Sequence, residues 1–124
     1  MSDITLGIIG GGQLGSMLAI AAKKLNVKTV IFSDDTNAPA QNFCNIFISG
    51  NYYDKQKISD FVNQVDIVTY EFENIPFEAL NEINRLKPVL PKPSVNRLIQ
   101  HRLAEKDFIN KLNIRTTRYV TIEK

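Results

Sequence analysis

The sequence predicts an α/β domain in which helices cover both faces of a parallel sheet. Three observations support this prediction. Short apolar, β-branched segments alternate with amphipathic helical segments through most of the 124 residues. Strands alternate with helices at a spacing that implies right-handed crossover connections. A glycine-rich turn, "GGGQLG" at 10–15, joins the first expected strand to the first expected helix.

The first half of the chain contains three of the expected strands. "ITLGIIG" at 4–10 is apolar and ends in glycine, which is typical of a buried strand. The segment 13–26 has apolar residues at helical spacing and two lysines in its last turns, where the helix dipole favours cations. Further strands are expected at 27–33 and 45–49, and "DDTNAPAQN" at 34–42 supplies turn residues between them.

The second half continues the alternation. A helix is expected over 54–64, and a strand over 65–73 whose Val and Ile residues indicate deep burial. "IPFEALNEINRL" at 75–86 has proline and glutamate near its start, as the first turns of helices prefer. The remaining segments are a brief strand between prolines, one long helix or two short ones, and an extended end: 88–93, 94–113 and 116–122.

Composition argues against several classes of protein. A hydrophobic content of 44% and a charged content of 23% are ordinary for a globular chain. No apolar run approaches the roughly 18 residues of a membrane span, and "MSDITLG" lacks the features of a signal peptide, so we expect a cytoplasmic protein without a membrane partner. The single Cys44 and the single His101 predict neither a disulfide nor a metal site.

Charge is unevenly divided along the chain. Residues 1–84 contain five Lys/Arg and ten Asp/Glu, a net −5, whereas residues 85–124 contain ten and three, a net +7. A basic segment of this kind is suited to phosphate groups of a nucleotide or a nucleic acid, or simply forms a solvated helix face. The aromatic residues are typical of a core and not of a base-stacking surface, so we expect no nucleic-acid partner.

The glycine loop is the first candidate site. Gly10, Gly12 and Gly15 fit G-x-G-x-x-G between a strand and a helix, where glycines allow close backbone approach and the helix N-terminus attracts anions. Asp34, 19 residues after Gly15, matches the acid that binds ribose in nicotinamide enzymes. The same glycines are also compatible with a turn that only lets the helix pack closely on the sheet. Gln13 adds an amide suited to a sugar or a heterocycle.

The stretch "TYEFEN" is the second candidate site. Thr69, Glu71 and Glu73 are expected to share one face of the strand, because side chains alternate along a strand. Carboxylates at the end of a buried strand are costly unless they are used or satisfied. A ribose diol, a metal ion or acid–base chemistry would each use them, and a metal is the least supported. We favour a ligand for Glu71, whereas Glu73 suits either a ligand or the backbone of the following turn.

Three segments, "IGGGQLGSML", "DIVTYEFENIP" and "RLAEKDFINKLNI", together resemble the carboxyaminoimidazole ribonucleotide synthetase (PurK) family, the ATPase subunit of phosphoribosylaminoimidazole carboxylase. The resemblance covers essentially the whole chain and is to the N-terminal, pre-ATP-grasp domain. It implies a Rossmann-like, three-layer substrate-binding domain over 1–92. Residues 93–124 would be a helical segment that begins the connection to an ATP-grasp domain absent from this chain.

The resemblance also implies a reaction in purine biosynthesis. Family members use ATP, magnesium and bicarbonate to make carboxyphosphate, and then carboxylate the exocyclic amine of aminoimidazole ribonucleotide. The lysine and glutamates that bind ATP and magnesium belong to later domains, and nothing in this chain matches them. The segment alone is therefore expected to hold no catalytic residue, metal or cofactor and to be inactive, and the full-length ligase is expected to form a homodimer in some members.

Site residues follow from the same resemblance. The residues expected to hold aminoimidazole ribonucleotide are Gly11, Gly12, Gln13, Leu14, Glu71 and Glu73, and Arg102 is expected to reach ATP. The glycine loop would then face the acceptor substrate. The alternative is a nicotinamide-dinucleotide-binding domain of an oxidoreductase, which rests on the glycines and Asp34 and leaves Gln13 and "TYEFEN" unexplained.

The chain departs from the family pattern at three positions. Ser16 stands where the family commonly has arginine, so one cation near the substrate is missing. Asn113 and Arg115 stand where the family usually has glycine and proline. We expect the last two changes to alter a turn more than the chemistry.

Overall fold

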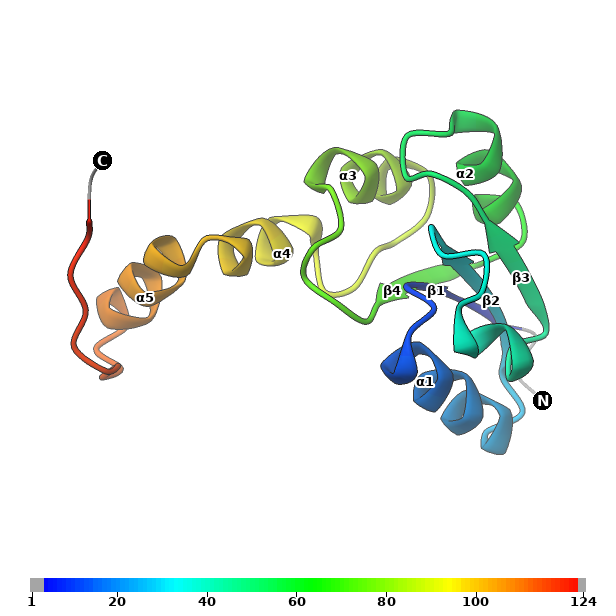
Figure 1. Cartoon of the computed structure of the whole chain (residues 1–124), viewed down its shortest axis with the longest axis horizontal. Helices are drawn as coiled ribbons and strands as arrows, with labels where there is room; N and C mark the ends of the chain where they lie inside the picture. Colours follow the sequence, from blue (N-terminus) through cyan, green and yellow to red (C-terminus); the bar gives the residue numbers. More distant parts are fainter. Residues whose placement is uncertain (1–3, 123–124) are drawn as a thin grey trace.

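The computed structural model describes residues 4–122 and shows one parallel sheet. The strand order is β3-β2-β1-β4, and all three strand pairs are parallel. Helices lie on both faces of the sheet (Figure 1), which confirms the predicted α/β class. The strands are β1 Thr5–Ile9, β2 Lys28–Ser33, β3 Ile46–Ser49 and β4 Ile67–Tyr70.

Two hydrophobic cores separate the three layers. On one face, α1 (Gln13–Lys24) and the 3-10 helix η1 (Pro39–Asn42) pack beside each other, and Ile8 contributes to a small core there. On the other face lie α2 (Lys55–Val62) and α3 (Phe77–Leu86), with Ile9 in the larger core. Consecutive residues of β1 thus point to opposite faces, as strand geometry requires. The stretch 34–42 was expected to be turn alone, so η1 is an unpredicted element.

The strand predicted over 65–73 is wrong in extent, because β4 ends at Tyr70. Its partner β1 ends at Ile9, and Glu71 N makes the last backbone hydrogen bond, to Ile9 O at 3.1 Å. Gly10 then turns the neighbouring chain away with a φ of 109°. The expectation that Thr69, Glu71 and Glu73 share a strand face is therefore also wrong, since both glutamates lie in the loop beyond β4.

The brief strand predicted at 88–93 is reduced to one bridge. Val89 pairs in parallel with Val68, through hydrogen bonds from Val68 N to Pro88 O (2.8 Å) and from Leu90 N to Val68 O (2.9 Å). Prolines at 88 and 91 have no backbone N–H with which to extend a ladder. Along the edge of β4 that faces away from β1, the bridge to Val89 therefore pairs the backbone at Val68 alone among the described residues.

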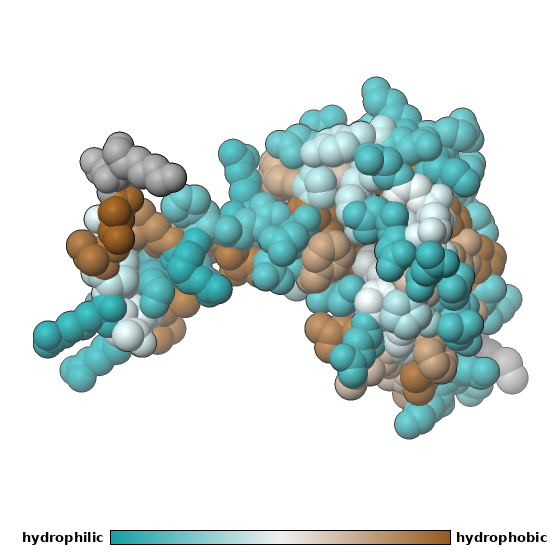
Figure 2. Space-filling model, in the orientation of Figure 1, coloured by the Kyte–Doolittle hydropathy of each residue, from teal (hydrophilic) through white to brown (hydrophobic). Residues whose placement is uncertain are grey.

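Residues 93–122 extend from the body as an arm (Figure 1). It contains two helices, α4 (Pro93–Gln100) and α5 (Arg102–Lys111), separated at His101, whose Nδ1 accepts a hydrogen bond from Ala104 N at 3.3 Å. No residue of α5 is buried, and hydrophobic side chains are visible on the surface of the arm (Figure 2). Within the described residues, no helix is long and apolar enough to cross a membrane.

The segment after α5 turns back along that helix without forming a strand in its described part. Asn113 makes the turn with a φ of 61°, a left-handed conformation that asparagine tolerates better than most residues other than glycine. Asn110 Nδ2 donates to Thr116 Oγ1 at 2.9 Å, and the Tyr119 hydroxyl donates to Asp107 Oδ1 at 2.5 Å. Asparagine thus serves the turn at the position where the family usually has glycine.

Candidate functional site

The glycine loop and the loop after β4 meet at the carboxyl edge of the sheet. Glu71 is half-buried, and its Oε1 accepts a hydrogen bond from Gly12 N at 3.2 Å, although the two residues are 59 positions apart. Neighbouring strands β1 and β4 end side by side, which brings the loops together. The helix dipole stabilises a carboxylate at the N-terminus of α1. The structure therefore brings Glu71 together with the predicted glycine loop.

Three glycines of the loop are required by packing, and a Cβ on Gly11 would lie 2.5 Å from Ala38 Cβ. A Cβ on Gly10 would lie 2.4 Å from Glu71 Cγ, and the positive φ of Gly10 is itself unfavourable for other residues. A Cβ on Gly15 would lie 2.5 Å from the carbonyl oxygen of Gly10. Close packing of the helix on the loop therefore accounts for Gly15 without any ligand, whereas Gly10 also makes room for Glu71.

The first turn of α1 keeps hydrogen-bond donors available. Between residues 4 and 122, no hydrogen-bond acceptor is found for the backbone N–H groups of Gln13 and Leu14, as expected at a helix N-terminus. Both side chains are exposed. Leu14 also lines an apolar hollow of about 360 Å³ with Met17, Leu18, Tyr70 and Glu71. A ligand at this edge would meet donors from the helix next to an acceptor from Glu71.

A second hollow, of about 220 Å³, lies directly over the glycines and is rich in acidic groups. Asp34, Asp35 and Glu71 line it, and its lining contains no Lys or Arg. Asp34 Oδ1 accepts a hydrogen bond from the Tyr52 hydroxyl at 3.4 Å. Burial, followed by the negative charge of Asp34, raises the pKa of Tyr52, so the phenol stays protonated and donates.

This acidic lining is poorly suited to the pyrophosphate of a dinucleotide. Asp34 does reach the expected hollow, as the nicotinamide alternative requires. However, the Gly12 N–H that would bind a phosphate oxygen already donates to Glu71. A pyrophosphate in this hollow would displace the Glu71 carboxylate from Gly12 and would lie beside Asp34 and Asp35. Its negative charge would be repelled by both aspartates. The geometry thus favours a ligand that presents hydrogen-bond donors.

Glu73 is exposed and acts on the structure through its backbone. Its carbonyl oxygen accepts hydrogen bonds from Asn96 Nδ2 at 3.1 Å and from Gln100 Nε2 at 2.6 Å. Its side chain borders a hollow of about 240 Å³ that Glu71 and Asn96 also line. Asn96 and Gln100 are not predicted by the sequence pattern, because two amides four residues apart on a helix look the same as solvent-facing ones.

Arg102 does not join the other predicted residues. It begins α5, its side chain is 80% exposed, and its Nη1 lies 2.7 Å from Glu105 Oε2. Figure 1 shows α5 well separated from the glycine loop. No hydrogen bond or ion pair links Arg102 to the glycine loop or to Glu71 within 4–122.

Ser16 and Cys44 have local roles in the fold. Ser16 is buried, and its hydroxyl donates to Gly12 O at 3.0 Å, so it supports the loop where the family commonly places a cation. Cys44 packs against the smaller core, and burial raises the pKa of its thiol. Among the described residues, no group of three or more His, Cys, Asp or Glu is placed to hold a metal ion.

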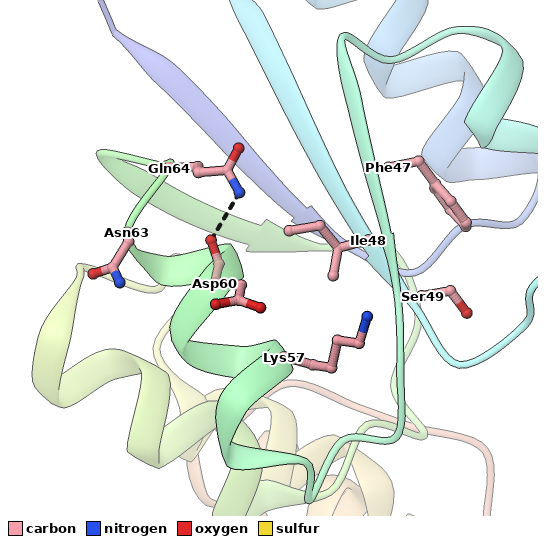
Figure 3. A pocket seen from close by; sticks show the side chains of 7 residues that line it. All are labelled: Phe47, Ile48, Ser49, Lys57, Asp60, Asn63 and Gln64. Carbon is pink, nitrogen blue, oxygen red and sulfur yellow. Dashed lines mark hydrogen bonds between the residues drawn. The ribbon is translucent and has the colours of Figure 1, made fainter.

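A larger hollow, of about 450 Å³, lies elsewhere, between the edge strand β3 and α2 (Figure 3). Lys57 and Asp60 line it together with Gln64, whose amide donates to Asp60 O at 2.9 Å. None of the predicted site residues is part of this lining. Size alone therefore does not identify the ligand site of this domain.

Comparisons with known proteins agree with the fold described above. The model of the ribonucleotide synthetase preATP-grasp domain matches residues 3–100. The bifunctional purine synthesis protein purC/E of Dictyostelium discoideum is 40% identical over 119 residues, which are 96% of this chain and 12% of that protein. N5-carboxyaminoimidazole ribonucleotide synthase of Brucella melitensis is 37% identical over 119 residues, which are 96% of this chain and 33% of that enzyme.

Solved structures show the same relationship. N5-carboxyaminoimidazole ribonucleotide synthetase of Thermus thermophilus superposes with a TM-score of 0.85 at 34% identity, over 90% of this chain and 31% of that one. The Aspergillus clavatus synthase in complex with ADP and 5-aminoimidazole ribonucleotide gives a TM-score of 0.79 at 27% identity, over 90% and 30%. The chain thus spans a third or less of the length of these relatives. It belongs to the ribonucleotide synthetase preATP-grasp domain family.

Proposed function

We propose that this domain binds aminoimidazole ribonucleotide for an ATP-grasp ligase that carboxylates this substrate in cytoplasmic purine biosynthesis. The observation that carries the proposal is the Glu71 carboxylate on Gly12, beside the N–H groups of Gln13 and Leu14, which have no acceptor among residues 4–122. An amine or a ribose hydroxyl donates to such a carboxylate. The similar Aspergillus clavatus structure contains 5-aminoimidazole ribonucleotide, which supports this choice of ligand.

Each predicted residue has a proposed part in binding. Glu71 accepts from the ligand, and the loop from Gly11 to Leu14 contacts it, with the backbone N–H groups of Gln13 and Leu14 and the side-chain amide of Gln13 as donors. Glu73 borders the adjoining hollow and is proposed as a second contact. Because no Lys or Arg lines the hollow over the glycines, the ligand's phosphate is proposed to bind cations from outside this domain.

The ATP and magnesium sites are assigned to the rest of the ligase, and Arg102 is proposed to reach ATP from this domain. Relatives with ADP or ATP bound support the use of ATP by the family. The described residues gather no carboxylate cluster that fits magnesium. We propose that residues 1–92 bind the substrate and that residues 93–124 lead to the ATP-grasp domain. Bicarbonate and a second subunit of a homodimer are proposed to bind outside this domain. The domain alone is then inactive.

The proposal is tested by NMR titration of the chain with aminoimidazole ribonucleotide and, separately, with NADH. We expect saturable shifts at the amides of Gly11, Gly12 and Gln13 with the ribonucleotide and none with NADH, because the hollow presents acceptors and negative charge. Inorganic phosphate serves as the control for nonspecific anion binding. Saturable shifts of the same amides with NADH alone would contradict the proposal and favour the dinucleotide alternative.

Arg102→Ala tests the nucleotide role when the domain is joined to its ATP-grasp domains. We expect KM for ATP to rise by about tenfold and KM for aminoimidazole ribonucleotide to stay unchanged, since one charge-assisted contact with phosphate is lost. Lys111→Ala, an exposed cation at the end of the same helix, is the matched control. Steady-state kinetics with each substrate varied in turn measure both constants. Normal ATP kinetics for Arg102→Ala would remove this residue from the nucleotide site.

A further inference from the structure

The loop that carries Glu71 has little hydrogen bonding of its own. Residues 72–75, which follow it, have no regular structure. Among residues 4–122, the hydrogen bonds that reach the backbone of 72–75 all come from two side chains of α4, Asn96 and Gln100. Phe72 and Ile75 supply apolar contacts with the larger core. The backbone of 72–75 is therefore held by α4, whereas the last hydrogen bond to the sheet is made by Glu71 N.

Both amides donate to the same two carbonyl oxygens. Gln100 Nε2 lies 2.6 Å from Glu73 O and 2.7 Å from Ile75 O. Asn96 Nδ2 lies 3.1 Å and 3.4 Å from these atoms. The residues are four positions apart and therefore lie on one face of α4. The two side chains form a clamp on the loop.

The burial of Asn96 shows that the clamp is a costly arrangement. Asn96 has 0% exposure, and its Oδ1 has no hydrogen-bond partner in the part of the chain that the structure describes. A buried amide oxygen without a partner destabilises a fold, and an apolar residue would avoid this penalty. What the asparagine provides in return is its Nδ2 donor to the loop.

We propose that Asn96 and Gln100 are positioning residues that keep the Glu71 carboxylate on Gly12. Holding Glu73 O and Ile75 O fixes the loop two and four residues beyond Glu71. The expected change in affinity for the substrate rests on the proposed function. The positioning of Glu71 by Asn96 and Gln100 does not depend on it.

The test uses Gln100→Met, which removes the donor and retains the length and helix preference of the side chain. Gln56→Met is the matched control, since Gln56 is an exposed helical glutamine that donates to Asp60 of its own helix. In the ligand-free chain, we expect Gln100→Met to shift the amide proton of Gly12 and to speed its hydrogen exchange. The affinity for aminoimidazole ribonucleotide is expected to fall by about threefold to tenfold, which corresponds to one of the two hydrogen bonds that the variant removes.

The two readouts separate the proposals. A Gly12 amide that keeps the wild-type shift and exchange rate in both Gln100→Met and Gln100→Glu overturns the positioning role. The same conclusion follows if exchange rises equally at all amides, because that result shows a purely structural residue. If the Gly12 signal responds but neither the wild type nor any variant binds aminoimidazole ribonucleotide, the positioning role stands and the proposed function fails.

Discussion

Gly10→Ala is expected to lower the free energy of unfolding by about 2–4 kcal/mol, the sum of backbone strain and overpacking. Gly10 has a φ of 109°, which an alanine adopts only with strain. Its new Cβ would also lie 2.4 Å from Glu71 Cγ, so the glutamate must move off the loop. Both effects act where the glycine loop meets the loop after β4. Urea unfolding followed by circular dichroism measures the change.

Gly12→Ala is the matched control for this experiment. Gly12 has a φ of −73°, and the nearest atom to its added Cβ would be the movable Glu71 Oε1, at 3.0 Å. We therefore expect a loss of less than about 1 kcal/mol, typical of a substitution without strain. Equal unfolding midpoints for the wild type and Gly10→Ala would show that Glu71 does not pack against Gly10 as described.

The sequence predicted the sheet more accurately than the ends of its strands. β1 and β2 were placed within one residue, because both are buried on two faces and bounded by glycine or turn residues. β4 was predicted too long, because the alternation of polar and apolar residues continues through 71–73. Its partner β1 has by then ended, and the chain turns away at Gly10. Strand length depends on the partner, and that information is not local in the sequence.

The candidate site also contains residues that the sequence indicates and residues that only the structure reveals. Glu71 was found because a carboxylate after a buried strand is unusual, and the structure places it on the glycine loop. The clamp of Asn96 and Gln100 was not found, because its existence depends on how α4 packs across the loop. The role of Gly15 was left open between ligand and packing, and its close approach to the Gly10 carbonyl supports packing. The sequence pattern does not indicate which residues of distant segments come into contact.

Glu71→Gln is expected to weaken binding of aminoimidazole ribonucleotide by about 10- to 100-fold, the loss of a charge-assisted hydrogen bond. Glutamine has nearly the same shape, so the loop is expected to keep its position and the change to act mainly through charge. Isothermal titration calorimetry of the chain measures the affinity. Glu78→Gln, which removes an exposed carboxylate from α3, is the matched control and is expected to bind as the wild type does.

The same variant is expected to gain affinity for pyrophosphate, which separates loss of a ligand contact from general damage. With the Glu71 charge removed, the N-terminus of α1 attracts an anion that the carboxylate no longer repels. A damaged loop would lose both ligands, whereas a neutralised carboxylate loses one and gains the other. Glu73→Gln extends the comparison, since a loss there would show that its carboxylate also contacts the ligand. Wild-type affinity of Glu71→Gln for the ribonucleotide would remove Glu71 from the binding site.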